Sequence, residues 1–357
     1  MARSEVRRRN VLVMRLSALG DVAMTIPVLY PVCRANPETR FVMLTKAWPA
    51  SMFHDRPDNL MVVGIDVKQE YKGPSGLMRL ASMLRREYDI DAVADLHNVL
   101  RTWVIDTSMR LHGIDVARLD KERARRKALI THKSDDPVTP TIERYRKVFE
   151  QLNLATGKDF TRLYDGKPMP VSSIVLDKEP GQRWVAVSPF SAHEGKCYPL
   201  ELMKQVVAQL SQRGNYWIFL MGGGKDEKIA LRSIARENQH VISMAEVKHG
   251  FTDEYALLGK CDVMLTMDSA NMHLASLMGL KTVTIWGATA PSCGFQGYGQ
   301  DSRDDLQLDM ACRPCSIYGE RECRYGDFRC LSGISPEQVV ERVVQIAEGL
   351  GSAPKNP

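Results

Sequence analysis

The chain has 357 residues, of which 44% are hydrophobic and 25% charged, and a formal net charge of +5. This length exceeds one ordinary hydrophobic core, so we expect two domains. No apolar run approaches the roughly 18–20 residues that span a membrane, and the basic N-terminus leads into a short strand pattern and not into an apolar signal core. These features predict a globular, cytoplasmic protein.

Positive charge is concentrated in the first half of the chain, in Arg7–Arg9 and in the run Lys121–Lys133. Such runs are most often solvated surface. The alternative is attraction to anionic lipid head groups or to a phosphorylated acceptor, which implies peripheral contact with the cytoplasmic face of an inner membrane. No aromatic-rich basic stripe accompanies the charge, so nucleic acid is not an expected partner.

Short apolar runs alternate with helical periodicity along the first half of the chain. The apolar runs lack a period of two, which is typical of strands buried on both faces of a parallel sheet. The predicted strands are 11–16, 41–45, 61–66, 91–95 and 116–119, and the predicted helices are 76–88, 99–112 and 143–152. Residues 153–182, rich in Gly, Pro and Lys, predict a linker.

The second half repeats this scheme. The predicted strands are 184–188, 216–221, 240–243, 262–266 and 281–286, and the predicted helices are 199–213, 225–237, 253–260, 269–279 and about 336–349. Two consecutive arrays of this kind predict two doubly wound α/β domains. Ligands bind beyond the carboxyl ends of the strands in such sheets, so we expect the two domains to face each other across a cleft that holds the active site.

The motif RLSALGDVAMTIPVL, residues 15–29, follows the first predicted strand and places Asp21 at a helix mouth. Asp21 can serve as a helix cap, which stabilises by about 1 kcal/mol. Alternatively, its carboxylate faces the cleft and acts as a general base. The motif is neither the glycine fingerprint of dinucleotide binders nor a phosphate-binding Walker loop.

Two loops of the second half carry polar candidates. In SPFSAHEGKCYP, Ser191 and Lys196 follow a strand, and Lys196 is either a solvent-exposed side chain or a point charge for a diphosphate. In FLMGGGKDEKIA, Asp226 and Glu227 follow three glycines that allow a ligand close to the backbone. These carboxylates either bind ribose or sugar hydroxyls or stabilise the helix N-terminus through its dipole.

The stretch MDSANMHLASLMGLKTVTIWGATAP, residues 267–291, predicts a loop, a helix and a strand. Asp268 and Ser269 suit a helix start because their oxygens bond the first amides. The remaining amides and the helix dipole form a site for an anion such as a phosphate. His273 is either a buried histidine satisfied by the backbone or part of that site.

Four of the eight cysteines form the cluster Cys312-x2-Cys315-x7-Cys323-x6-Cys330. Four thiols with a leading C-x2-C can hold a structural zinc ion, although the spacing is not that of a standard zinc ribbon. Free, packed thiols are the alternative. A catalytic metal is not expected, because no His or carboxylate pattern accompanies the cysteines.

Together, the four motifs resemble those of glycosyltransferase family 9, the lipopolysaccharide heptosyltransferases, over residues 10–345. The resemblance implies the GT-B fold, with an acceptor-binding domain at 1–165, a nucleotide-sugar-binding domain at 166–335, and a C-terminal helix and tail at 336–357 that pack toward the N-terminal domain. It also implies inverting transfer of a heptose from ADP-heptose to a lipid-linked, lipopolysaccharide core-type acceptor, with no cofactor required for catalysis.

The family's site residues carry over by motif. Asp21 matches the catalytic base, and Lys196 matches a lysine that contacts the donor diphosphate or sugar. The expected donor contacts are Ser191, Lys196, Glu227, Asp268, Ser269, Ala270 and His273. Ala270 stands where the family has Gly, and His97-Asn98 replaces Gln-Gly in the DLHNVLRT stretch that supplies the expected acceptor contact, Arg101.

Two alternatives remain open. One is a GT-B transferase that uses another nucleotide sugar, such as a UDP- or GDP-linked hexose. The other is a non-catalytic, zinc-stapled binding protein on the same scaffold.

Overall fold

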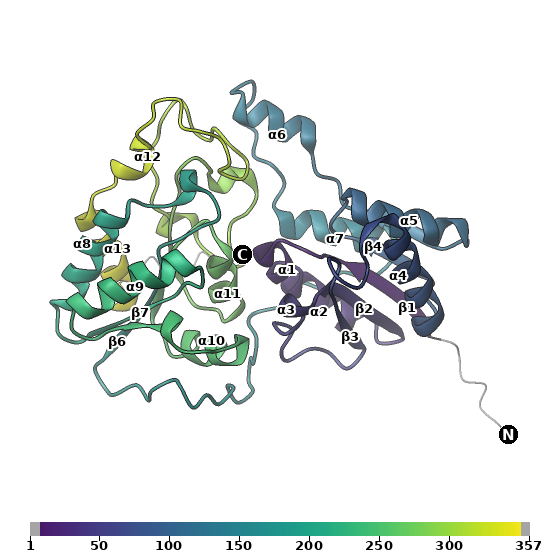
Figure 1. Ribbon diagram of the computed structural model, residues 1–357, viewed down its shortest axis with the longest axis horizontal. Helices are drawn as coiled ribbons and strands as arrows, with labels where there is room; N and C mark the ends of the chain where they lie inside the picture. Colours follow the sequence, from purple (N-terminus) through teal and green to yellow (C-terminus); the bar gives the residue numbers. More distant parts are fainter. Residues whose placement is uncertain (1–7, 351–357) are drawn as a thin grey trace. The chain divides into compact units, whose positions relative to one another are not determined.

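The structure is a computed structural model that describes residues 8–350, which divide into two compact units (Figure 1). Unit 1 holds the described residues up to Lys121 together with Thr141–Thr161. Unit 2 holds Glu122–Pro140 and the described residues from Arg162 onward. Arg7 of the first basic run and the end of the C-terminal tail lie outside the described residues.

Unit 1 is built on a five-stranded parallel sheet in the order β3-β2-β1-β4-β5. In the register, Leu12 of the central strand lies opposite Val42 on one side and Val93 on the other. The strands are β1 (Arg9–Met14), β2 (Thr39–Lys46), β3 (Leu60–Ile65), β4 (Ala92–Asp95) and β5 (Asp115–Arg118). The helices are α1 (Leu19–Ala23), α2 (Ile26–Ala35), α3 (Ala47–Ala50), α4 (Gly73–Tyr88), α5 (Leu100–Leu111) and α7 (Thr141–Gln151).

Helices cover both faces of this sheet, which explains why its inner strands β1, β2 and β4 are mostly buried. Helices α4 and α5 pack on one face, where Leu80, Leu84 and Ile105 meet Leu12 and Leu44 in one buried cluster. Helices α2 and α7 pack against each other, and they also contact β2 and β4, respectively (Figure 1). The helical layers leave the carboxyl ends of the strands available for a ligand.

Unit 2 has a second five-stranded parallel sheet, in the order β10-β9-β6-β7-β8. When the strands of each sheet are numbered along the chain, both sheets have the same order: third, second, first, fourth, fifth. The strands are β6 (Arg183–Ser188), β7 (Tyr216–Leu220), β8 (Val241–Ser243), β9 (Val263–Met267) and β10 (Thr282–Ile285). The helices are α6 (Arg123–Ile130), α8 (Leu200–Ser211), α9 (Lys225–Glu237), α10 (Phe251–Leu258), α11 (Ala270–Leu277), α12 (Arg329–Ser332) and α13 (Pro336–Ala347).

Helices α8, α9 and α13 contribute to the main core of unit 2, and Leu257 of α10 joins a smaller cluster with Trp184 and Phe219. We predicted that α13 packs toward the N-terminal domain. Within unit 2, its buried Val339 and Val343 lie in the main core. The physical reason is its apolar face, which the strands of the second sheet and α8 cover.

The ten strands lie within two residues of their predicted positions, and no helix or strand interrupts residues 153–182, the predicted linker. The unit boundary falls at Thr161–Arg162, a few residues before the expected 165. A larger difference is the segment Glu122–Pro140, which we assigned to the first domain and which belongs to unit 2. There Arg126 of α6 is buried, with its guanidinium 5.5 Å from the ring centres of Phe295 and Tyr318.

Within residues 8–350, none of the helices has the length and apolar character required to cross a membrane.

Candidate active site

Each sheet has one point where its connections diverge, between its first and fourth strands. In such folds this switch point opens a crevice at the carboxyl ends of the strands. In unit 1 the point lies between β1 and β4, and in unit 2 it lies between β6 and β9. Three of the motifs and the DLHNVLRT stretch follow these four strands, whereas the glycine-rich motif follows β7. The topology therefore explains why most of the candidate residues gather in two clusters.

The cluster in unit 2 is centred on the carboxylate of Asp268, which directly follows β9 and is 4% exposed. Lys196, in a 3-10 turn after β6, places Nζ 3.0 Å from Asp268 Oδ2. Thr289, after β10, donates its hydroxyl to the same oxygen at 2.9 Å. The hydroxyl of Ser191 donates to the backbone carbonyl of Asp268 at 2.9 Å. Three loops are thereby held together around one buried carboxylate.

This network changes the expected role of Asp268 and Ser269 as caps of α11. Ser269 occupies the N-cap position, but its side chain makes no capping bond and lies 3.2 Å from the Thr266 hydroxyl. The Asp268 carboxylate accepts from Lys196 and Thr289, so it is engaged by side chains of other loops. The eight-residue helix α11 begins at Ala270, and His273 is buried in its first turns.

Glu227 binds the glycine-rich loop that precedes α9. Its Oε2 accepts from the backbone N–H groups of Gly223 and Gly224, at 2.8 and 3.0 Å. Of the two functions considered for this carboxylate, the structure shows the one that supports the helix N-terminus. Asp226 is exposed beside it.

The cluster in unit 1 is centred on Asp21, the third residue of α1. Its Oδ2 accepts from the backbone N–H of Ala18 at 3.1 Å and forms an ion pair with the guanidinium of Arg15. Asp21 is therefore not the N-cap residue itself, although its bond to Ala18 supports the start of the helix. The side chains of Arg15 and Asp21 are 9% and 20% exposed, respectively, so this pair is largely shielded from solvent.

The DLHNVLRT stretch forms a tight turn after β4. Asp95 Oδ1 accepts from the backbone N–H groups of His97 and Asn98, both at 2.9 Å, and Oδ2 accepts from the Thr102 hydroxyl at 2.7 Å. Asn98 has a φ of 49°, a conformation open to Gly and tolerated by Asn. The replacement of the family's Gly by Asn98 thus preserves the turn. Arg101 lies exposed in the first turn of α5.

Burial lowers the pKa of His97 to about 3, and the positive charges of Arg15, Lys121 and Lys46 add to this effect, while Asp21 opposes it. The His97 imidazole is therefore neutral at ordinary pH, and the positive charge that acts on it comes from Arg15, Lys121 and Lys46.

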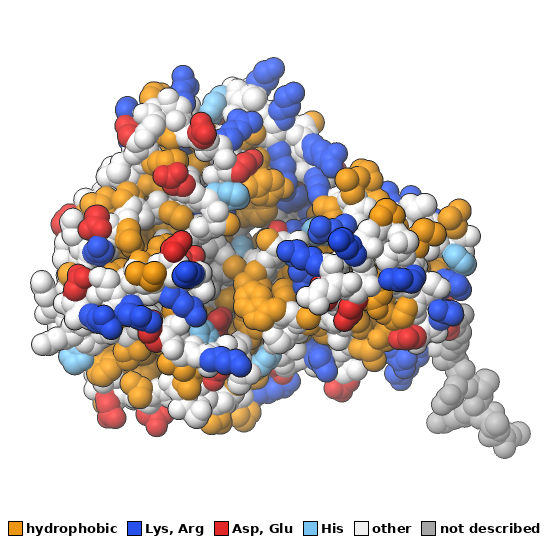
Figure 2. Space-filling model, viewed as in Figure 1, with side chains coloured by type: hydrophobic (Ala, Val, Ile, Leu, Met, Phe, Trp, Pro, Cys, Tyr) orange, Lys and Arg blue, Asp and Glu red, His pale blue; other side chains and the backbone are white. Residues whose placement is uncertain are grey.

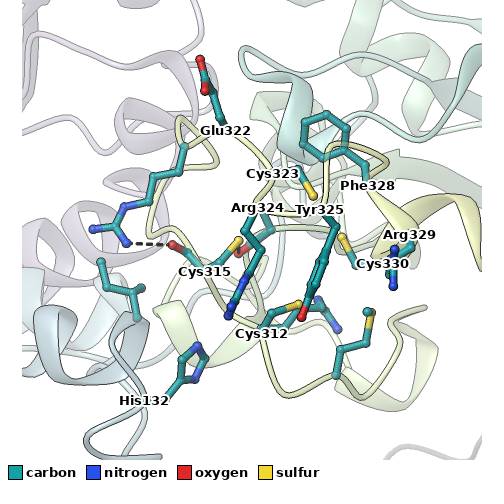
Figure 3. Close-up of a pocket in the computed structure, with 15 residues that line it drawn as sticks. His132, Cys312, Cys315, Glu322, Cys323, Arg324, Tyr325, Phe328, Arg329 and Cys330 are labelled. Atoms are coloured by element: carbon teal, nitrogen blue, oxygen red, sulfur yellow. Dashed lines mark hydrogen bonds between the residues drawn. The ribbon is translucent and has the colours of Figure 1, made fainter.

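The four clustered cysteines line one cavity of about 250 Å³ in unit 2 (Figure 3). Burial raises the pKa of the Cys323 thiol, but the backbone N–H groups of Tyr325, Phe328, Asp327 and Gly326 outweigh burial and hold the pKa below its usual value. Burial raises the pKa of Cys315 and Cys330. Across the part of the chain that the structure describes, no three His, Cys, Asp or Glu side chains are grouped so that they could hold a metal ion. The predicted zinc site is therefore not formed by the side chains as they lie.

Several site residues escaped the sequence interpretation. Arg15 and Thr289 stand inside motifs that were singled out, but nothing in the sequence paired them with Asp21 and Asp268. Arg313 donates to the carbonyls of Trp286, Gly287 and Thr289, and so fixes the loop after β10. An isolated arginine among surface charges gives no sign of such a role.

Comparison with known proteins agrees with this geometry. The sequence model of glycosyltransferase family 9 (heptosyltransferase) matches residues 77–325. Lipooligosaccharide heptosyltransferase 2 of Campylobacter jejuni is 21% identical over 334 residues, which are 92% of this chain and 96% of the relative. A family 9 glycosyl transferase from Veillonella parvula superimposes with a TM-score of 0.71 at 19% identity, over 97% of this chain and 99% of that one. The ADP-heptose lps heptosyltransferase II of E. coli gives a TM-score of 0.65 at 17% identity, over 96% and 99%.

Two parallel-sheet units, together with these structural similarities, define the GT-B fold. The chain belongs to glycosyltransferase family 9, the heptosyltransferases. It is therefore an enzyme, and the non-catalytic binding protein is set aside.

The loop that carries Lys196 packs closely on Gly319, which has a φ of 83°. A Cβ at this position would come within 2.4 Å of Lys196 Cγ. We predict that Gly319→Ala lowers the free energy of unfolding by about 2–4 kcal/mol, the sum of a left-handed backbone penalty and overpacking. Gly326 is the matched control, since its φ is 75° and nothing lies within 4 Å of its Cβ position. Gly326→Ala should cost only the backbone penalty of about 1–2 kcal/mol in the same urea titration. Equal losses in both variants would show that the Lys196 contact does not matter.

Proposed function

We propose that this enzyme transfers a heptose from ADP-heptose, with inversion, to a lipopolysaccharide core-type acceptor. The observation that carries the proposal is the meeting of Lys196, Ser191 and the start of α11 around Asp268, at the switch point of unit 2. This arrangement offers a cation and helix-terminal amides to one anionic group, as a nucleoside diphosphate requires.

Donor binding is proposed for unit 2. The amides that begin α11, from Ser269 and Ala270 onward, would bind phosphate oxygens, and Lys196 would turn from Asp268 to the diphosphate. Ala270 is the first residue of α11, so the backbone at this position is regular helix, which accommodates the methyl group. Ser191 and His273 would complete the phosphate and sugar contacts. Glu227, which holds the glycine-rich loop, would meet the ribose hydroxyls.

In the proposed reaction, an acceptor hydroxyl attacks the anomeric carbon from the side opposite the diphosphate. The bond from the anomeric carbon to the phosphate oxygen breaks, and the nucleoside diphosphate leaves with the bonding electrons. Lys196 and the helix amides stabilise the negative charge that develops on this leaving group. Asp21 takes the proton of the acceptor hydroxyl, and Arg101 contacts the acceptor. None of these proposed steps uses a protein-bound cofactor.

The base assignment is tested with Asp21→Asn, which preserves the size of the side chain and removes its basicity. We expect kcat to fall about 10²–10⁴-fold, the usual contribution of a general base, with little change in ADP affinity measured by calorimetry. Asp115→Asn, at an exposed carboxylate on β5 of the same unit, is the control and should retain full turnover. Undiminished turnover of Asp21→Asn would remove this residue from the mechanism.

The identity of the nucleotide is the most specific part of the proposal. The solved E. coli relative is described as an ADP-heptose enzyme, which favours ADP here, whereas a UDP- or GDP-linked sugar is the competing donor. A ligand that binds only the native state raises the melting temperature, so ADP should raise it more than UDP or GDP at equal concentration. Lys196→Ala should abolish most of the ADP shift, because it removes the proposed diphosphate cation. A larger shift with UDP or GDP would reassign the donor, and an unchanged ADP shift in Lys196→Ala would refute the role of the lysine.

Peripheral contact with an anionic membrane is proposed from the basic surface of α6. Arg123, Arg125 and Lys127 are exposed on this helix, and Lys133 follows it. Figure 2 shows basic side chains gathered where Figure 1 draws α6. Basic residues near an anionic surface each contribute about 1 kcal/mol, which would keep the enzyme close to a lipid-linked acceptor.

A structural metal ion at Cys312, Cys315, Cys323 and Cys330 also stays a proposal. Its support is the shared cavity and the amide groups that favour the Cys323 thiolate, and binding would require the thiols to turn toward one another. Elemental analysis of the purified protein should give about one zinc ion per chain, and Cys323→Ser should lose it. Absence of metal, with all eight thiols of the chain titrating under denaturing conditions, would establish packed free cysteines.

A further inference from the structure

We infer that Arg15 is the positioning residue of Asp21, which holds the carboxylate ionised and oriented for proton abstraction. This inference rests on the proposed function, because it assigns a partner to the proposed base. It starts from the sequence order, since Arg15 directly follows β1 and Asp21 lies in the short helix that comes next.

The guanidinium of Arg15 is anchored before it reaches Asp21. Its Nη1 donates to the backbone carbonyl of Leu96 at 2.8 Å, in the turn after β4, while Nη2 pairs with Asp21 Oδ2. Arg15 thus bridges the ends of β1 and β4, the two strands that bound the switch point of unit 1. A planar, forked cation can make both contacts at once, whereas a lysine ammonium would be a single point charge.

Helix α7 completes the arrangement. The Arg15 guanidinium carbon lies 5.9 Å from the ring centre of Tyr145, and the Tyr145 hydroxyl donates to the backbone carbonyl of Asp21 at 3.2 Å. Tyr145 therefore contacts the Arg15 guanidinium with its ring and the Asp21 backbone with its hydroxyl. Both partners of the pair are fixed from outside, so the carboxylate has little freedom to rotate.

The pairing has an electrostatic consequence. A positive charge in contact with a carboxylate favours its ionised form and keeps it competent at lower pH. Tyr145 also contacts Asp21 from α7, and the charges of Lys46 and Lys121 act on His97 in this region. Burial lowers the pKa of His97 to about 3, so this imidazole stays neutral above that pH. Burial raises the pKa of Asp106, the partner of Arg118, to about 7, so an acid limb that moves in a variant of Arg15 and stays in a variant of Arg118 would report the Asp21 carboxylate.

The test is Arg15→Gln in the full chain, assayed for transfer between pH 4 and 9. We expect kcat to fall about 10–100-fold, with KM for donor and acceptor changed less than threefold. Loss of the charge should raise the midpoint of the acid limb by about one pH unit or more. Arg15→Lys should keep the acid limb near its original pH but recover only part of kcat, because the charge remains and the fork is lost.

Two controls separate this role from a merely structural one. Arg118→Gln breaks another ion pair of unit 1, with Asp106, and should change the melting temperature without moving the acid limb. If Arg15→Gln does not fold, Arg15→Lys decides, and a wild-type kcat in that variant would overturn the inference. Wild-type kcat and acid limb in Arg15→Gln would overturn it as well. If Asp21→Asn keeps turnover, the proposed base fails and the role of Arg15 fails with it. If Asp21→Asn loses turnover and Arg15→Gln does not, only the role of Arg15 fails.

Discussion

The geometry of this enzyme depends on the divergence of chain connections at the first and fourth strands of each parallel sheet. Helices cover both faces of the sheets, so polar groups that must meet a ligand can gather only at the strand ends. In unit 2 the loops after β6, β9 and β10 converge on Asp268. In unit 1 the loops after β1 and β4 converge on Arg15 and Asp21. The same constraint thus produces two clusters of different chemistry.

Both clusters hold a carboxylate that is largely shielded from solvent against a cation, and the two pairs have different roles in the proposed reaction. Lys196 lies on a short turn and is held by a single ion pair to Asp268, so a diphosphate can compete for it. Arg15 contacts a backbone carbonyl and an aromatic ring as well as Asp21, so its side chain has less freedom to move. The difference in anchoring fits a cation that binds substrate in one unit and a cation that orients a base in the other.

Sequence reasoning predicted the fold better than it predicted the contacts of the candidate site residues. Long apolar runs determine buried parallel strands almost by themselves, which is why the ten strands were placed closely. Helix α6 was not predicted because its sequence is mostly charged. Nothing in that sequence indicates that Arg126 is buried, since its partners Phe295 and Tyr318 lie far along the chain. The Asp268 pairing was missed for a similar reason, since an aspartate before a helix predicts a cap, and only tertiary packing brings Lys196 and Thr289 to it. Contacts between distant loops leave no local pattern in the sequence.

The assignment of Glu122–Pro140 to unit 2 has a consequence for how the protein is made. The chain passes from one unit to the other at Lys121–Glu122, at Pro140–Thr141 and at Thr161–Arg162. On the ribosome, α6 emerges before the rest of its own unit, so it must wait for residues beyond Arg162 to be synthesised before Arg126 can be buried. Unit 1 can complete its sheet earlier, because all its strands precede that segment. A nascent chain would therefore carry a basic helix without its packing partners for the time that translation of roughly 190 further residues takes, at about 5–20 residues per second.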